Sequence, residues 1–327
     1  IEKSLINLLK KIDYDKYNID LYLLSKGTLY NELPKEVNVV FLSKPSFYKY
    51  LPFFILKKLI KTDKTIKYDV AIDFSAYNNT LSAYTLNSNA NKKVIWIHND
   101  YKIKYKNEFK FRVLFNLSKS KYKNFDEIVA VSEGVKESFK ELTGLTAKKV
   151  IPNYINTDEI LKKSEEEVNF HVDDDNINFC FLGRLVYQKG LDLLFPIIKE
   201  YKENNEEFQL YIIGDGPLKD KLINQVEELD LFDNITFLGA KNNPFPYLKK
   251  CDYLILNSRY EGQGMVALEA KSLGLKVIMP ERLNKYLNID YIDINDLKGV
   301  KKFKKKTDKL EDYNSNITEK INKLLGD

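Results

Sequence analysis

Residues 251–280 read CDYLILNSRYEGQGMVALEAKSLGLKVIMP, and this stretch decides which fold class the sequence predicts. The apolar run 251–257 predicts a buried strand, and the run 275–280 predicts another. Between them, residues 265–273 have the length and spacing of a short helix. A strand, a loop, a helix and a second strand form the repeating unit of an α/β domain with a parallel sheet. Polar residues follow the first strand, at the carboxyl end where open α/β sheets bind ligands.

The expected helix has one apolar face. A turn of about 100° per residue places Val266, Ala270 and Leu273 on that face. Ala267 and Lys271 would point away from it.

Two carboxylates bracket the turn before this helix. Glu261 precedes the helix, whereas Glu269 lies within it on the side that we expect to be buried. An inward carboxylate costs free energy unless hydrogen bonds satisfy it. The backbone amides near Gly262 and Gly264 open a helix N-terminus, which favours an anion. A ligand with hydroxyl and phosphate groups suits such a site, although a solvated glutamate beside an ordinary loop explains the same spacing.

Length and composition indicate a globular protein. The 327 residues are enough for two domains, and 44% hydrophobic with 30% charged residues is not the composition of a disordered chain. Cys180 and Cys251 border apolar runs, so we expect buried free thiols rather than disulfides or a zinc site. No apolar run reaches the roughly 18 residues of a membrane-spanning helix. A cytoplasmic location is therefore the default expectation.

The charge is distributed unevenly along the chain. Residues 1–150 hold 27 Lys and Arg against 16 Asp and Glu, whereas residues 151–327 hold 25 against 31. Lysines alternate with aromatic residues in segments 44–61 and 101–125, as in a surface that lies on the inner face of an anionic membrane. Helices packed on a sheet with their lysines in water give the same pattern. No nucleic-acid recognition motif accompanies the charge, so we expect no nucleic-acid partner.

Strands alternate with helices in two successive runs. Residues 156–176 are acidic and polar, which marks a connection. We therefore expect an N-terminal domain over 1–155, a C-terminal domain over 156–312, and a final helix over 313–327 that packs back on the N-terminal domain. No strand precedes the first helix, so the first strand and its glycine-rich turn are expected to be missing.

Candidate binding residues stand at strand ends. Gly183 ends a predicted strand, and Arg184 and Lys189 follow it on a loop where two cations could neutralise a diphosphate without a metal. His98 ends another predicted strand, where a structural and a catalytic role are equally expected.

In combination, these motifs resemble the retaining glycosyltransferases of family 4. The resemblance covers about residues 120–280 and is carried by Gly183-Arg184, Lys189-Gly190, Gly214-Asp-Gly-Pro217 and Glu261-x₇-Glu269. It implies an α/β structure of the GT-B type, with two Rossmann-like parallel-sheet domains that face each other across a cleft. The N-terminal domain (1–155) would bind the acceptor, and the C-terminal domain (156–312) would bind the nucleotide sugar.

The resemblance also implies roles for individual residues. Glu269 would bind the ribose of a nucleotide sugar, and His98 would lie beside the reacting carbon. The diphosphate would be held by Gly183, Arg184 and Lys189, and the donor sugar by Glu261 with the amides of Gln263, Gly264, Met265 and Val266. The family often has an aromatic residue at the position of Gln263, which leaves the donor-sugar contacts open.

The implied reaction needs neither a metal nor a cofactor apart from the nucleotide-sugar donor, for which UDP is the expected nucleotide. A hexose or N-acetylhexosamine would pass, with retained configuration, to a glycan or lipid-linked acceptor in surface-polysaccharide synthesis. Two alternatives stay open: a nucleotide-sugar hydrolase or epimerase, which needs no acceptor, and a non-enzymatic basic adaptor that binds a membrane or nucleic acid.

Overall fold

The computed structural model describes residues 1–45, 47–48, 51–76, 78–204 and 207–326. The chain divides into two compact units: unit 1 comprises residues 1–154 and 312–327, and unit 2 comprises residues 155–311. The boundaries between the units fall after residues 154 and 311, each one residue before the position expected from the sequence. The two units are described separately below.

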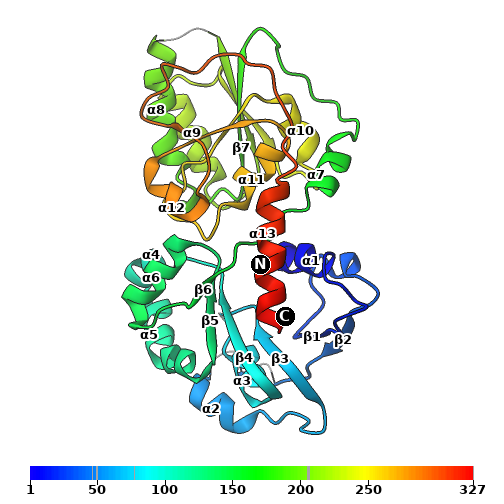
Figure 1. Ribbon diagram of the computed structural model, residues 1–327. Helices are drawn as coiled ribbons and strands as arrows, with labels where there is room; N and C mark the ends of the chain where they lie inside the picture. Colours follow the sequence, from blue (N-terminus) through cyan, green and yellow to red (C-terminus); the bar gives the residue numbers. More distant parts are fainter. Residues whose placement is uncertain (46, 49–50, 77, 205–206, 327) are drawn as a thin grey trace. The chain divides into compact units, whose positions relative to one another are not determined.

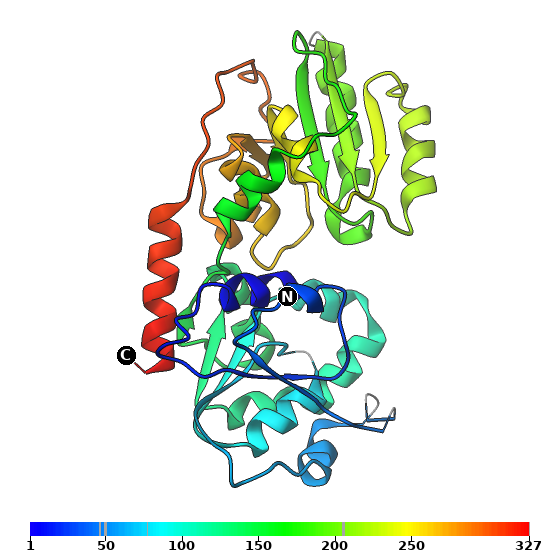
Figure 2. The ribbon, with the colours of Figure 1, turned by 90° about the vertical axis from the view of Figure 1, so that its right-hand side faces the viewer.

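Unit 2 is built on a parallel sheet of six strands. Their order is β12-β11-β10-β7-β8-β9, so that successive strands are added outward on both sides of the first pair. The order reverses between β7 and β10, which is the topological switch point of a doubly wound sheet. Strands β7, β8 and β9 lie side by side in green to yellow (Figure 2). The strands are β7 (Ile177–Leu182), β8 (Phe208–Ile213), β9 (Ile235–Gly239), β10 (Tyr253–Ile255), β11 (Lys276–Met279) and β12 (Ile292–Asp293).

Apolar side chains of these strands form the core of unit 2, because a parallel sheet is covered on both faces. Fully buried examples are Phe179, Leu210 and Ile278. Both cysteines are buried free thiols, as expected. The helices are α7 (Thr157–Ser164), α8 (Leu191–Asn204), α9 (Lys219–Glu228), α10 (Phe245–Lys250), α11 (Met265–Ser272) and α12 (Asn284–Leu287).

Helix α7 lies inside residues 156–176, which were expected to form the connection between the two domains. The Asn156 side chain accepts a hydrogen bond from the Glu159 amide and so caps the helix. Ile160 is buried, whereas most of the helix is polar. The short apolar stripe explains why composition alone did not predict this helix.

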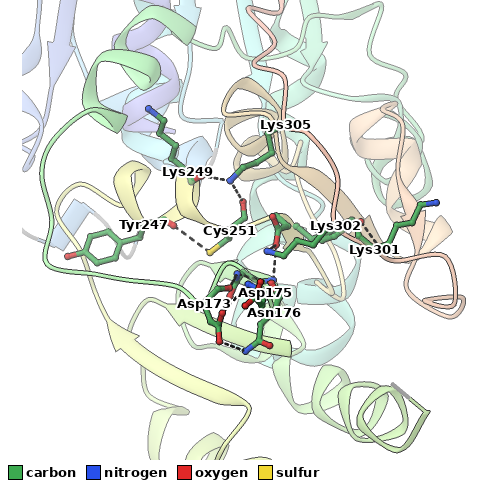
Figure 3. Close-up of polar contacts among 12 residues, drawn as sticks. Asp173, Asp175, Asn176, Tyr247, Lys249, Cys251, Lys301, Lys302 and Lys305 are labelled. Atoms are coloured by element: carbon green, nitrogen blue, oxygen red, sulfur yellow. Dashed lines mark hydrogen bonds and ion pairs between the residues drawn. The ribbon is translucent and has the colours of Figure 1, made fainter. Parts of the chain in front are cut away.

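An extended strap over residues 301–306 is fastened to the body of unit 2 by lysines (Figure 3). The Lys305 ammonium donates to the carbonyl oxygens of Lys249 (2.6 Å) and Cys251 (3.1 Å). Lys302 forms an ion pair of 2.8 Å with the buried carboxylate of Asp252. These contacts fix the segment that leads from unit 2 to the C-terminal helix.

Unit 1 contains two parallel sheets. One pairs β1 (Asp20–Leu23) with β2 (Asn38–Phe41), and the other has the order β3-β4-β5-β6. The Tyr68 hydroxyl donates to Asp20 at 2.7 Å, which links the two sheets. The strands of the larger sheet are β3 (Lys67–Asp73), β4 (Asn89–Ile97), β5 (Glu127–Ala130) and β6 (Lys149–Val150).

The last helix of the chain, drawn in red in Figure 1, belongs to unit 1. It begins two residues earlier than expected, and Tyr313 on it donates to the Asn153 carbonyl at 3.0 Å. At its other end the Leu324 carbonyl accepts from Lys92 on β4 at 3.2 Å. The helices of unit 1 are α1 (Glu2–Leu9), α2 (Phe53–Leu59), α3 (Asn79–Asn87), α4 (Lys102–Asn107), α5 (Phe109–Ser118), α6 (Glu133–Thr143) and α13 (Glu311–Leu325).

Candidate functional site

The loops that follow β7 and β10 meet at the switch point of unit 2. Lys189 from the first loop forms an ion pair of 2.7 Å with Oε1 of Glu261 from the second. The Ser258 hydroxyl donates to the same oxygen at 2.6 Å. The carboxylate of Glu261 is therefore buried but satisfied, as a buried charge must be. The strand order thus brings together two residues that the sequence separates by 72 positions.

A glycine allows these two loops to approach closely. Gly190 has a φ of +65°, and a Cβ placed on it would lie 2.3 Å from the Asn257 carbonyl oxygen. The Asn257 side chain in turn donates to the Gly190 carbonyl at 3.2 Å, and the Arg259 amide donates to the Gln188 carbonyl at 2.7 Å. A residue with a side chain at position 190 would separate the loops.

Glu269 is 6% exposed, so the expectation that its carboxylate faces inward is confirmed. The predicted faces of helix α11 are partly wrong, however. Ala267, which was expected to point away from the core, is fully buried, whereas Val266 is only half-buried. The helix connects β10 to β11 and packs against both β11 and α7, so it is covered on more than one side and a single apolar face does not describe it. Gly264 caps it with a φ of +67°.

The remaining residues that were expected to bind the donor differ in how exposed they are. The Arg184 guanidinium is exposed and makes no hydrogen bond or ion pair with any described residue. Gln263 is buried, and Met265 is half-buried at the start of α11. Gly183 directly follows β7, and the chain at Gly214 approaches it so closely that a Cβ at position 214 would lie 1.9 Å from the Gly183 carbonyl oxygen. The predicted diphosphate cations therefore comprise one exposed arginine and one lysine already paired with Glu261.

A second ion pair at the same loops was missed by the sequence analysis. Arg259 donates two hydrogen bonds to the carboxylate of Asp192, at 2.8 and 2.6 Å, and its guanidinium lies 3.9 Å from the centre of the Tyr187 ring. Hydrogen bonds from Arg259 lower the pKa of Asp192. Arg282 donates to the Ser258 carbonyl at 3.1 Å, and burial lowers the pKa of its guanidinium. The only sequence signal for the ion pair between Arg259 and Asp192 is that Arg259 lies two residues before Glu261 in the loop after β10.

His98 belongs to unit 1, where it follows β4. It is buried against the ring of Phe74, at 4.2 Å between ring centres, and stacks on Trp96 at 5.9 Å. Burial lowers the pKa of His98 to about 3, so the imidazole is neutral at pH 7. Neither ring nitrogen has a well-formed hydrogen bond to a described residue, and the Asn153 side chain beside the ring opposes the lowering of the pKa only in part.

Two Asp-x-Asp sequences, at 13–15 and 173–175, have the spacing that some metal-dependent transferases use, but each shapes a turn here. Asp13 accepts from the backbone amide of Asp15 at 3.1 Å, and Asp173 accepts from that of Asp175 at 3.0 Å, so each pair shapes a turn. The described residues contain no group of three or more His, Cys, Asp or Glu side chains arranged to hold a metal ion. Nor does any described helix combine the length and the apolar character that crossing a membrane requires.

Two sequence profiles match this chain. One, described as "Glycosyl transferases group 1", matches residues 162–283, and the other, "Glycosyltransferase Family 4", matches residues 1–159. The first contains the loops and the helix described above, from Lys189 to Glu269.

Individual proteins agree with the profiles. "Uncharacterized glycosyltransferase MJ1059" of Methanocaldococcus jannaschii is 30% identical over 292 residues, which cover 84% of this chain and 70% of that protein. A Campylobacter jejuni protein, "N-acetylgalactosamine-N,N'-diacetylbacillosaminyl-diphospho-undecaprenol 4-alpha-N-acetylgalactosaminyltransferase", is 28% identical over 272 residues, or 80% of this chain and 72% of that one. The structure of Anabaena Alr3699/HepE in complex with UDP matches with a TM-score of 0.59 and 19% identity over 86% of this chain and 77% of that chain. The chain therefore belongs to glycosyltransferase family 4, and it is a glycosyltransferase with the GT-B fold.

Proposed function

We propose that the protein transfers a hexose or an N-acetylhexosamine from a UDP-sugar to a glycan or lipid-linked acceptor, with retention of configuration and without a metal ion. The observation that carries this proposal is the ion pair between Lys189 and Glu261 beside the buried carboxylate-bearing helix α11. It places a cation, two carboxylates and a helix N-terminus at the switch point of a doubly wound sheet, where such sheets bind nucleotides.

Glu269 is the residue that we assign to the ribose. A buried carboxylate accepts hydrogen bonds from two neighbouring hydroxyl groups more readily than a neutral side chain does, because charge-assisted hydrogen bonds are stronger. Its position within the first two turns of α11 also keeps it near the helix N-terminus, where the backbone amides favour an anion. Ribose hydroxyls and a diphosphate on the same ligand match these two features.

Lys189 and Arg184 are assigned to the diphosphate, whose charge increases as the sugar leaves. Two cations aimed at that group supply the stabilisation that a metal ion supplies in other transferases. Lys189 is held in place by Glu261, so the carboxylate orients the ammonium before the ligand arrives. In this proposal Glu261 is a positioning group and a donor-sugar ligand, together with Gln263 and the amides of residues 264–266, and not a covalent nucleophile.

His98 is assigned to the acceptor side of the reaction. Because its imidazole is neutral, it can orient a hydroxyl group through a hydrogen bond but cannot act as a cation. The proton of the acceptor hydroxyl then passes to a diphosphate oxygen of the leaving group on the same face of the sugar. The C–O bond to the diphosphate breaks as the acceptor oxygen bonds to the same face of that carbon, and this same-face attack retains the configuration.

The choice of UDP and of the acceptor is supported by similar proteins. The matching structure of Anabaena Alr3699/HepE is a complex with UDP. The name of the Campylobacter jejuni relative states an acceptor linked to undecaprenol through a diphosphate. Two Escherichia coli relatives, 30% and 29% identical over 47% of this chain, are named O-antigen biosynthesis glycosyltransferases.

Calorimetric titration with UDP, GDP and ADP tests the donor site. We expect UDP to bind the wild type most tightly, and Glu269→Ala to weaken UDP binding by roughly 10- to 100-fold, as the loss of charge-assisted hydrogen bonds predicts. Glu281→Ala, which removes an exposed carboxylate of the same unit, is the matched control and should bind as the wild type does. Equal UDP affinity in the wild type and Glu269→Ala would refute the ribose assignment.

The fate of the sugar separates transfer from the two alternatives. With a radiolabelled UDP-sugar and a lipid-linked glycan acceptor, transfer moves the label to the acceptor with release of UDP. Free labelled sugar without acceptor dependence would instead identify a hydrolase, and a changed UDP-sugar would identify an epimerase. No UDP binding at all would favour the adaptor.

A membrane partner is the last part of this proposal, and helix α5 supports it. Phe109, Val113 and Leu117 recur every four residues along one side of α5 and are all exposed. Lys110 and Lys119 are exposed on the same helix and just beyond it, and they suit an anionic headgroup layer. The membrane proposal therefore rests on residues 101–125. The other segment that was expected to contact a membrane, 44–61, includes residues 46, 49 and 50, which lie outside the described residues.

Sedimentation with lipid vesicles tests this surface. We expect Phe109→Ser to reduce binding to vesicles with anionic lipid, because a phenylalanine side chain that enters the interface contributes about 2 kcal/mol. The control is Phe232→Ser in unit 2, since the two side chains are 70% and 69% exposed. Equal losses in both variants, or unchanged binding in Phe109→Ser, would contradict the assignment.

A further inference from the structure

Unit 1 contains a cavity of about 230 Å³ whose walls come from helices α3 and α5 and from the segments beside them. One wall is aromatic. Tyr101, Phe111, Phe115 and Tyr122 form it, with neighbouring ring centres 5.7 to 6.1 Å apart. None of the residues assigned to the nucleotide or to the donor sugar lines this cavity.

The cavity also has polar lining residues, and three of them offer hydrogen-bond donors. Thr80 is 1% exposed, and its hydroxyl makes no hydrogen bond with any residue of the described ranges. Ser118 is also buried; its oxygen accepts from the Asn79 amide at 2.8 Å, which leaves the hydroxyl hydrogen to donate elsewhere. The Asn78 oxygen caps α3, so its amide nitrogen still has two hydrogens to donate. Thr80 and Ser118 are buried and Asn78 is half-buried, and donors in such positions favour a ligand with several oxygen acceptors.

The charge near the cavity is already balanced. Lys121 lines the floor, but its ammonium donates to the Ala76 carbonyl (2.8 Å), Asn79 (3.2 Å) and Ser82 (3.0 Å). These three hydrogen bonds use all three of its hydrogens. The Ser82 hydroxyl then donates to the buried carboxylate of Asp73 at 2.5 Å. A carboxylate or phosphate ligand would have to break this internal network, so the cavity selects a neutral ligand.

We infer that this cavity binds one neutral sugar ring of the acceptor. A pyranose presents apolar C–H faces, which stack on aromatic rings, and hydroxyl oxygens, which accept from Thr80, Ser118 and Asn78. A lipid chain would cover the aromatic wall but leave the three donors unsatisfied, at about 1–3 kcal/mol for each buried group. The volume holds a single ring, since it lies below the roughly 300–1,000 Å³ of pockets for larger ligands.

This inference rests on the proposed transferase function, because it names a subsite for the substrate that receives the sugar. It goes beyond that function in assigning the recognition of a ring to residues that take no part in donor binding. A subsite of this kind would determine which glycan the enzyme extends, whereas the donor site would determine which sugar is added.

Two substitutions on α5 distinguish the cavity from the rest of that helix. Leu114 and Leu117 are 47% and 48% exposed, so a tryptophan is tolerated equally at either position. Only Leu114 lines the cavity, and Leu114→Trp narrows it. Leu117→Trp is the matched control, since it adds the same side chain to the same helix outside the cavity; the titration contains no lipid, so the membrane surface to which Leu117 is assigned does not affect the result. Thr80→Val removes one donor while keeping the shape of the side chain.

The probes are the methyl glycosides of glucose, galactose, N-acetylglucosamine and N-acetylgalactosamine, titrated into the full chain by saturation-transfer NMR. We expect at least one glycoside to bind the wild type and Leu117→Trp saturably in the millimolar range. Leu114→Trp should weaken that binding at least tenfold and Thr80→Val about fivefold, whereas saturating UDP should leave it unchanged because the two sites share no residue.

The inference is overturned if no glycoside binds saturably, if Leu114→Trp binds as the wild type does, or if Leu117→Trp weakens binding equally. A parallel UDP titration keeps this result separate from the proposed function. If UDP binds and sugar is transferred but no glycoside enters the cavity, only the subsite is wrong. If UDP does not bind, the transferase proposal fails, and the assignment of the cavity to the acceptor of that reaction fails with it.

Discussion

Replacing Lys189 by methionine should reveal what the buried ion pair contributes. The ammonium and the Glu261 carboxylate lie 2.7 Å apart, and their side chains are 18% and 8% exposed. Removing one partner of a buried pair costs about 3–5 kcal/mol, because the other charge stays buried without compensation. Ser258 still donates to Glu261 in the variant, so we expect the lower end, about 3 kcal/mol. For a domain of this size, that lowers the melting temperature by about 6–12 °C.

A double-mutant cycle measured by scanning calorimetry separates the pair from the single side chains. Glu261→Gln keeps the shape of residue 261 and removes its charge, so the double variant with Lys189→Met no longer buries an uncompensated charge. We expect a coupling free energy of about 2 kcal/mol between the two positions. Lys323→Met in the exposed pair with Glu319 is the control and should change stability by less than about 0.5 kcal/mol.

The same variants test the function of the pair. Lys189→Met should also weaken UDP binding by roughly 10- to 100-fold, since a charge-assisted hydrogen bond to the diphosphate is lost. Glu261→Gln should leave UDP affinity unchanged and lower the rate of sugar transfer. The reasoning is refuted if Lys189→Met is as stable as the control variant, or if the two positions contribute independently.

Two further outcomes follow from the backbone and from burial. Gly190→Ala should destabilise the protein by about 3 kcal/mol, because it adds left-handed backbone strain and brings a Cβ against the Asn257 carbonyl oxygen. The control is Gly144→Ala, which has a similar φ of +72° but open space around it and should cost only about 1 kcal/mol. Equal urea midpoints for the two variants would exclude the close approach. Because the pKa of His98 is lowered to about 3 from 6.5, the unfolded chain binds its proton first as the pH falls, so stability is lost between pH 6.5 and pH 3. Between pH 7 and pH 5 the free energy of unfolding of the wild type should fall by about 2 kcal/mol more than that of His98→Gln, as measured by urea unfolding. An equal fall in both proteins would show that the histidine is not buried as a neutral group.

Local features of the sequence were sufficient for most strands and helices. The predicted strand that ends at Gly183 is β7 (Ile177–Leu182), and the predicted helix 265–273 is α11 (Met265–Ser272). Apolar runs and helical spacing identify such elements because they depend on residues that are close in the chain. The same spacing correctly predicted that Glu269 is buried. It failed for Ala267, since it assumes that only one face of a helix is covered.

The tertiary structure alone decided which of these elements lie side by side. Strand β10 pairs with β7 although about 70 residues separate them, and only that pairing brings Lys189 to Glu261 and Arg259 to Asp192. The cavity of unit 1 likewise combines Thr80 and Leu114 from two different helices. Residue spacing along the chain encodes local conformation, whereas strand order and helix packing depend on contacts between distant segments, which no short motif records.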